Sequence, residues 1–269
     1  MSATGRMWKL QEKPIVLAHR AGGNEAPENS LLAFANMEEK GFKYIESDVH
    51  ASRDGVVVIF HDDTLERTTN GRGKIAHKSW AELAEVRDHS GHSLLLFADV
   101  LEKFPQLVLN IDSKEWQVIR HLVREIKIHD AQERISLSSF SEMRLKVLRR
   151  LLPGVTSSLG EGALVLLVLA AHLPFPLQNI LCWFVPGNKQ KVEAVQVPVA
   201  AYGIKIITPA FIQLCHQRGL AVHVWTINEE VEMRRLLELG IDALITDEPS
   251  RARRVIEEFW ASKAENRPE

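Results

Sequence analysis

Cysteine is scarce in this chain, and its charges nearly balance. Among 269 residues the two cysteines, Cys182 and Cys215, lie in apolar stretches and lack the C-x-x-C spacing of a redox or zinc motif. We expect them to be structural thiols of a reducing compartment. The formal net charge of −2 at pH 7 offers no general attraction to polyanions, so no nucleic-acid partner is expected.

Glycine-rich phosphate loops and a secretory signal are also missing. Met1 to Pro14 is polar and lacks the apolar core of a signal peptide, so the cytoplasm is the expected compartment. No dinucleotide fingerprint and no P-loop occur, which removes the common nucleotide-binding frameworks from the predictions. No internal sequence repeat is found either.

The chain does contain a regular alternation of strand and helix patterns. Short apolar runs such as Ile15–Ala18, Tyr44–Val49 and Leu107–Ile111 are separated by stretches with helical periodicity. Strands spaced by helices imply a parallel sheet, and about eight such units without a linker favour a closed barrel. We therefore predict an α/β fold, a single-domain (β/α)8 TIM barrel with a small insertion after the second strand region. The expected boundaries are an N-terminal extension at 1–13, the barrel at 14–262 and a C-terminal tail at 263–269.

One segment, residues 163–185, is almost wholly apolar. His172, Pro174 and Pro176 interrupt it, and a membrane span needs about 20 consecutive apolar residues, so no span is predicted. The favoured interpretation is a buried helix followed by a hydrophobic loop. The alternative is an apolar flap near the barrel mouth that meets acyl chains or contacts a membrane surface.

Ionisable residues gather where the predicted strands end. Glu46 and Asp48 are two apart on a strand and so share a face, and Asp112 ends a different strand. In a parallel barrel these ends meet at one mouth, where active sites are built. Three carboxylates on rigid strand ends suit one divalent cation, Mg²⁺ or Ca²⁺.

Two histidines, His19 and His61, also follow apolar strand patterns. Imidazole titrates near neutrality, so a pair of them suits proton transfer to and from a reacting group. Arg20 and Lys114 stand beside these acids and histidines in the sequence and are expected to contact a phosphate. The pattern predicts a metal-dependent phosphodiesterase.

A whole series of motifs resembles the glycerophosphodiester phosphodiesterase family and covers almost the whole chain. In order, the motifs are His19-Arg20, Pro27-Glu28-Asn29-Ser30, Glu46-Ser47-Asp48-Val49, Arg53-Asp54-Gly55, His61-Asp62, Asn110-Ile111-Asp112-Ser113-Lys114, Ser138-Ser139-Phe140, Trp225-Thr226-Ile227-Asn228 and Ile245-Thr246-Asp247-x-Pro249. The resemblance implies a TIM barrel that uses a divalent metal to hydrolyse glycerophosphodiesters to sn-glycerol 3-phosphate and an alcohol.

The resemblance also implies a role for each matching residue. His19 and His61 would be the catalytic acid and base, and Glu46, Asp48 and Asp112 would bind the metal. Arg20 and Lys114 would contact the phosphate, and Trp225 would line the substrate pocket. Glu28, on the substrate side, would help shape the first loop around the metal site. Asp112 departs from the pattern, because most members carry Glu there. The shorter side chain puts the choice of metal in question. Ser30 replaces the usual Thr and keeps the hydroxyl.

Several alternatives stay open at this stage. Attack on phosphorus by a glycerol hydroxyl, through a cyclic phosphate, and direct attack by water would use the same residues, and either histidine could be the acid. The apolar segment motivates a second activity, that of a lysophospholipase D acting on lysophospholipids. A catalytically silent barrel that binds phosphate esters is the rival from another class. The head group and the oligomeric state are not predicted.

Overall fold

The structure, a computed structural model, describes residues 13–265. The expected N-terminal extension therefore lies outside the described residues except for Lys13. At the other end, the last helix, α10 (Pro249–Glu265), continues three residues into the segment expected as a tail.

Eight parallel strands form the barrel, and they neighbour one another in the order β7-β6-β5-β2-β1-β12-β11-β8. Their bounds are β1 (Ile15–His19), β2 (Tyr44–Ala51), β5 (Val108–Ser113), β6 (Ile135–Ser138), β7 (Thr156–Ser157), β8 (Ala194–Pro198), β11 (Ala221–Trp225) and β12 (Ala243–Thr246). A parallel bridge between Ser157 and Val192 joins the two ends of this order, supported by the 2.8 Å bond from Ser157 N to Lys191 O. The barrel is thus nearly closed, and the predicted TIM-barrel fold is confirmed.

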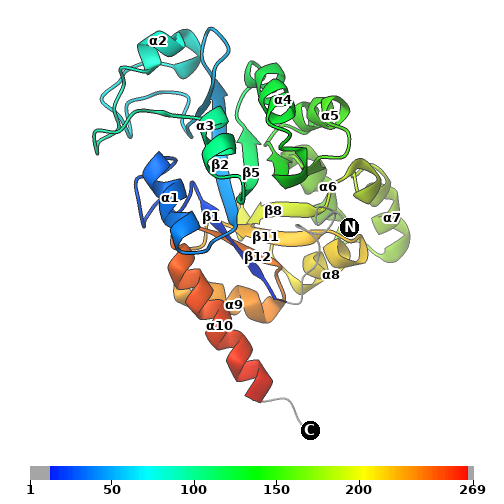
Figure 1. Cartoon of the computed structure of the whole chain (residues 1–269). Helices are drawn as coiled ribbons and strands as arrows, with labels where there is room; N and C mark the ends of the chain where they lie inside the picture. Colours follow the sequence, from blue (N-terminus) through cyan, green and yellow to red (C-terminus); the bar gives the residue numbers. More distant parts are fainter. Residues whose placement is uncertain (1–12, 266–269) are drawn as a thin grey trace.

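Helices follow the strands and surround the sheet (Figure 1). Besides α10 they are α1 (Leu31–Glu39), α3 (Phe97–Lys103), α4 (Val118–Ile128), α5 (Glu142–Leu151), α6 (Glu161–Ala170), α7 (Phe175–Trp183), α8 (Pro209–Gln217) and α9 (Glu230–Leu239), with 3-10 turns at Gln132–Arg134 and Asn188–Gln190. Hydroxyl caps begin several of them: Ser30, Ser141 and Thr208 each accept a bond from a backbone N–H of the first turn. These caps fix the points at which loops from the strand ends turn into helices.

The predicted insertion after the second strand is also present. It contains β3 (Val57–Ile59), a 3-10 turn (Ile75–His77), α2 (Trp80–Leu83) and β4 (Leu95–Leu96). β3 pairs antiparallel with β2 and β4 antiparallel with β3. Its own small core packs Phe60, Leu65 and Ile75 together, so the insertion is a stable extension at the barrel mouth and not a loose loop.

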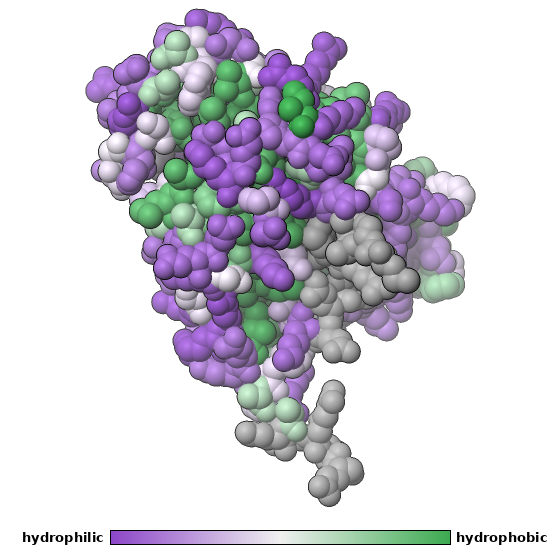
Figure 2. Space-filling view, in the orientation of Figure 1, coloured by the Kyte–Doolittle hydropathy of each residue, from purple (hydrophilic) through white to green (hydrophobic). Residues whose placement is uncertain are grey.

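Two large apolar clusters fill the space between the sheet and its helices, one on each half of the barrel. A third, small cluster centres on Leu17, Val108, Ala243 and Ile245. Figure 2 shows a face covered largely by hydrophilic side chains, with smaller hydrophobic areas between them.

The apolar segment 163–185 differs from the favoured expectation of a buried helix and a loop. It forms two helices, α6 and α7, and many of their apolar side chains are exposed, Phe175 and Trp183 among them. The expectation was wrong because an apolar pattern does not distinguish a buried face from an exposed one. Among residues 13–265, no helix is long and apolar enough to cross a membrane.

Candidate active site

Adjacent strands bring the three predicted carboxylates together. In the parallel register of β2 and β5, Asp48 lies opposite Asp112 and Glu46 opposite Asn110. All three carboxylates are buried and line the cavity at the barrel mouth, Glu46 and Asp48 from the middle of β2 and Asp112 from near the end of β5. Three acids are thereby held on one face of the barrel mouth, as the sequence predicts.

Lys114 joins two of these acids. Its Nζ atom lies 2.7 Å from Asp48 Oδ1 and 2.7 Å from Asp112 Oδ2. Burial works against the ammonium, but the charges of Asp48 and Asp112 overcome it and raise the pKa of Lys114. Lys114 is therefore a fixed positive charge at the floor of the mouth.

Glu46 has weaker partners than Asp48: its Oε2 lies 3.8 Å from His19 Nε2 and accepts a 3.4 Å bond from Arg20 N. Burial, and then the nearby charge of Asp48, raise the pKa of Glu46 to about 7. Asp48 behaves in the opposite way: burial opposes its charge, but Lys114 lowers the pKa of its carboxyl, and Asn29 Nδ2 donates a 3.1 Å bond to it. The site thus holds more negative charge than Lys114 compensates.

His19 is the last residue of β1, and a carboxylate fixes its ring. Its Nδ1 lies 2.6 Å from Asp247 Oδ1, and its Nε2 lies 3.8 Å from Glu46 Oε2. Burial lowers the pKa of His19, but the bond to Asp247 and the charge of Glu46 outweigh it, so that the pKa is raised. Asp247 is held in turn by a 2.8 Å bond from Asn228 Nδ2.

His61 reaches the same mouth, but not for the reason that the sequence suggested. It follows β3, which runs antiparallel to β2 and is not a barrel strand. The hairpin brings the chain back along β2, and Phe60 N bonds to Asp48 O at 3.0 Å, so His61 is returned to the level of Asp48. Its Nδ1 lies 2.6 Å from Asp62 Oδ1. Burial lowers the pKa of His61, with further contributions from Lys114 and Arg20.

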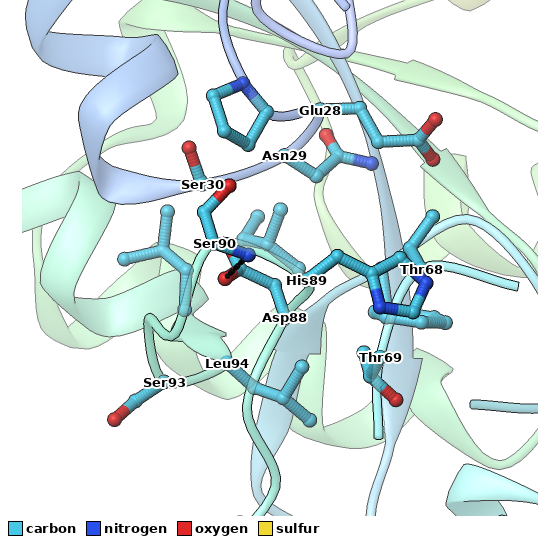
Figure 3. A pocket seen from close by; sticks show the side chains of 14 residues that line it. Glu28, Asn29, Ser30, Thr68, Thr69, Asp88, His89, Ser90, Ser93 and Leu94 are labelled. Atoms are coloured by element: carbon cyan, nitrogen blue, oxygen red, sulfur yellow. Dashed lines mark hydrogen bonds between the residues drawn. The ribbon is translucent and has the colours of Figure 1, made fainter. Parts of the chain in front are cut away.

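An ion-pair chain links the two loops that carry the histidines. Glu28 accepts bonds from Arg20 Nη1 at 3.1 Å and from Arg67 Nη2 at 2.7 Å. Arg67 also binds Asp62, the partner of His61. Glu28 therefore shapes the first loop, as expected. It lines a separate cavity of about 270 Å³ between the start of α1 and the insertion, and Figure 3 shows its carboxylate at the edge of that cavity beside Asn29.

The main cavity at the barrel mouth has a volume of about 670 Å³, within the range of small-molecule sites. Apart from Glu28, every predicted site residue lines it: His19, Arg20, Glu46, Asp48, His61, Asp112, Lys114 and Trp225. Trp225 packs edge to face against Phe140, with ring centroids 6.1 Å apart. One wall of the cavity is polar and charged, and the other is apolar.

The apolar wall comes from α6 and from the β9–β10 hairpin (Ala200–Ala201 and Ile204–Lys205). Leu164, Val165, Val168 and Leu169 of α6 line the cavity together with Ile204. The alternative expectation, an apolar element near the mouth, is thereby confirmed in its position.

The carboxylates fit a divalent cation in their chemistry. Asp112 Oδ1 is buried and has no hydrogen-bond partner, and burial, followed by the charge of Asp48, raises the pKa of Glu46. Both features are what a hard cation with oxygen ligands would relieve. Among the described residues, no three His, Cys, Asp or Glu side chains are already grouped in a metal-holding arrangement.

Sequence reasoning missed two carboxylates and an arginine. Asp62 and Asp247 orient the histidines, and Arg67 joins Asp62 to Glu28. Asp62 directly follows His61, so the sequence places the two side by side without showing that they bond. The pairing of Asp247 with His19 could not be assigned, because it spans 228 positions.

Two histidines, three acids and two cations gathered around one cavity at the mouth of a (β/α)8 barrel define the class of the protein, a TIM-barrel enzyme. The chain matches the sequence profile of the Glycerophosphoryl diester phosphodiesterase family over residues 19–251. It is similar to the probable glycerophosphodiester phosphodiesterase 2 of Mycobacterium tuberculosis, with 34% identity over 244 residues and 90% of both chains covered. A lysophospholipase D of Homo sapiens is 24% identical over 279 residues, which cover 91% of this chain and 87% of that protein.

Among solved structures, a phosphodiesterase from Oleispira antarctica in complex with the product sn-glycerol-3-phosphate has a TM-score of 0.75 and 26% identity. The match covers 91% of this chain and 97% of that one. The chain belongs to the glycerophosphoryl diester phosphodiesterase family, and it is a phosphoric diester hydrolase. The predicted family is confirmed.

Proposed function

We propose that this enzyme hydrolyses glycerophosphodiesters to sn-glycerol 3-phosphate and an alcohol in the cavity at the barrel mouth. The observation that carries the proposal is the convergence there of two histidines, each with Nδ1 on a carboxylate, with Lys114 and Arg20. The product named for the Oleispira antarctica enzyme supports the same reaction.

Two histidines can divide the proton transfers of this reaction. Since Nδ1 of each ring is bound to a carboxylate, Nε2 is the atom left to exchange a proton with substrate. One ring accepts the proton of the attacking hydroxyl as the new bond to phosphorus forms. The other ring donates a proton to the alkoxide as its bond to phosphorus breaks. Attack by water gives the products directly. Attack by a glycerol hydroxyl gives a cyclic phosphate, which water then opens with the roles of the two rings exchanged.

We assign the donor role to His19. Its ring contacts Asp247 and lies near Glu46, and both carboxylates favour the imidazolium. His61 lies in a more exposed position, with the positive charges of Lys114 and Arg20 nearby, which favours the neutral ring that an acceptor requires. Arg20 and Lys114 offset the charge on the phosphoryl oxygens.

Glu46, Asp48 and Asp112 would hold one divalent cation, Mg²⁺ or Ca²⁺. When bound, such an ion neutralises phosphate charge and polarises the oxygens attached to it. Lys114 contacts two of the three acids and would share them with the ion.

The test is choline release from glycerophosphocholine by the wild type and by His19→Ala and His61→Ala. Each variant is expected to lose about 10²–10⁴-fold in kcat, while circular dichroism and the melting temperature stay near those of the wild type. His92→Ala is the control, because His92 is an exposed residue of the insertion. Near-normal turnover by both active-site variants would overturn the assignment.

The apolar wall favours a second candidate, lysophospholipase D activity. An acyl chain would lie along Leu164 and Val168 while its phosphodiester reaches His19 and His61, since all four line one cavity. Val168→Asp is expected to lower kcat/KM for lysophosphatidylcholine at least about tenfold, because it places a charge on an apolar path. Turnover of glycerophosphocholine should change little. Equal losses on both substrates would remove this candidate.

A further inference from the structure

The outer side of the α6–α7 hairpin is unusually apolar for a surface. Isolated exposed apolar residues are ordinary, but a contiguous group of them marks an interaction site. The two helices pack side by side (Figure 1), and their exposed apolar side chains form a surface that we call the apolar rim: Leu169, Phe175, Leu177, Ile180, Trp183 and Phe184. Trp183 is 87% exposed and Phe175 73% exposed.

The apolar rim meets the cavity at Leu169. Leu169 belongs to both, because it is exposed on α6 and also lines the cavity that holds the histidines. The β9–β10 turn extends the same surface, with Tyr202 93% exposed and Ile204 lining the cavity. The rim is thus an extension of the apolar cavity wall to the outside of the molecule.

The charges around the apolar rim are mainly positive. Residues 162–192 contain no Asp or Glu. Lys189 and Lys191 are exposed in the loop between α7 and β8, at the amino end of that strand. Lys205 is exposed at the end of the β9–β10 hairpin. Two carboxylates also lie nearby: Glu161, at the start of α6, accepts a 3.4 Å bond from Tyr202 Oη, and Glu232 is within electrostatic range of Lys205. Lysines beside exposed Trp, Phe and Leu are the composition of surfaces that lie on anionic lipid.

We propose that the apolar rim and the β9–β10 turn dock onto the surface of an anionic phospholipid bilayer. The helices contain 10 and 9 residues, so each is too short to cross a hydrocarbon core of about 30 Å. They lie in the interface, with Trp183 and Phe175 among the lipid head groups and the lysines on the lipid phosphates. Docking places the side of the barrel that carries α6 and α7 against the bilayer, with the mouth of the cavity at the edge of that contact.

A bilayer fits this surface better than a second copy of the chain. A partner protein seated on the rim would cover the cavity mouth, because Leu169 and Ile204 belong to both. A fluid lipid surface leaves the mouth accessible to amphiphiles. The idea that docking delivers substrate to the cavity rests on the proposed function. Binding of the rim to vesicles does not, because it is measured without catalysis.

The test is co-sedimentation of the whole chain with vesicles of phosphatidylcholine mixed with phosphatidylglycerol, compared with pure phosphatidylcholine. The double variant Phe175→Ser/Trp183→Ser is expected to lower the partition coefficient at least about tenfold. The matched control is Leu32→Ser/Ile128→Ser, which removes two exposed apolar side chains from α1 and α4 and is expected to bind like the wild type.

A second variant tests the charges. Lys189→Glu/Lys205→Glu is expected to weaken binding several-fold on the anionic vesicles and hardly at all on pure phosphatidylcholine, and added salt should reduce this difference. Failure of the wild type to bind anionic vesicles would overturn the proposal, as would equal binding by the rim and control variants. A dimer in light scattering that becomes a monomer in the rim variant would identify the surface as a protein interface and overturn it too.

Glycerophosphocholine hydrolysis, measured on the same preparations, separates the two proposals. It also reports folding, since the substituted rim residues Phe175 and Trp183 are not among those that line the cavity of the histidines and carboxylates. Vesicle binding without turnover would contradict the proposed function and leave the docking surface standing. Turnover without vesicle binding would do the reverse.

Discussion

Replacing Asp247 with Asn tests how the carboxylate beside His19 contributes to the reaction. Asn keeps the shape of the side chain but removes the negative charge 2.6 Å from His19 Nδ1. A charge-assisted bond of this kind contributes about 1.5–3 kcal/mol. Since each 1.36 kcal/mol corresponds to a tenfold change in rate, kcat is expected to fall about 10–100-fold, and further if the ring also turns.

The same variant has a defined effect on the pH profile. Asp247 raises the pKa of His19, so its loss lowers that pKa. His19 as proton donor must be protonated, and the alkaline limb of kcat/KM should therefore move to lower pH in Asp247→Asn. The assay is choline release from glycerophosphocholine across a pH series.

A second Asp–His pair provides the matched control. Asp242 comes directly before the first residue of β12, at the end of that strand away from the mouth. Its Oδ2 atom lies 2.8 Å from His216 Nε2. Asp242→Asn removes the same kind of bond but should leave kcat and the pH profile of the folded enzyme unchanged. If Asp247→Asn kept both wild-type kcat and the wild-type alkaline limb, the assignment of His19 as donor would be refuted.

Three further predictions test the fold. Gly55 and Gly91 have similar φ angles, +85° and +84°, but a Cβ at Gly55 would overlap the His121 ring and one at Gly91 would meet open space. In urea unfolding, Gly55→Ala should therefore lower the free energy of unfolding by about 1–3 kcal/mol more than Gly91→Ala does. Equal losses of stability would contradict the packing around Gly55. Leu167→Ala empties a fully buried position on α6 and should cost about 2–5 kcal/mol in the same assay; a loss below 1 kcal/mol would show that α6 is not packed as described. The partners of Asp62 lower its pKa to about 2. The wild type should therefore be more stable than Asp62→Asn above pH 3.9, the ordinary Asp pKa being about 3.9, and this advantage should vanish as the pH falls to about 2. A stability difference that does not change with pH would contradict the ion pairing.

The barrel and most of its mouth could be predicted because both follow from local patterns. Apolar strands spaced by helices imply parallel neighbours, and parallel neighbours align their carboxyl ends. This is why Glu46, Asp48 and Asp112 meet as expected. The position of His61 was right for a wrong reason, because the Asp54-Gly55 turn is too short for a parallel crossover and makes β3 the antiparallel partner of β2.

Other features depend on contacts that no local pattern contains. Asp247 reaches His19 only because β12 and β1 are neighbours in the sheet. Arg67 ties Asp62 to Glu28 across the insertion, and the spacing of these residues carries no sign of it. Apolar composition alone likewise could not show that Trp183 faces outward.

The most direct measurement is choline release from glycerophosphocholine by EDTA-treated enzyme, before and after adding Mg²⁺ or Ca²⁺. The account predicts that turnover is lost with EDTA and restored by one of the ions. It also predicts that Glu46→Gln, which removes a charge but retains the size of the side chain, needs more of that ion for half-maximal rate. Turnover unaffected by EDTA would contradict the cation site formed by Glu46, Asp48 and Asp112. An absence of turnover with either ion would contradict the proposed hydrolysis of glycerophosphodiesters.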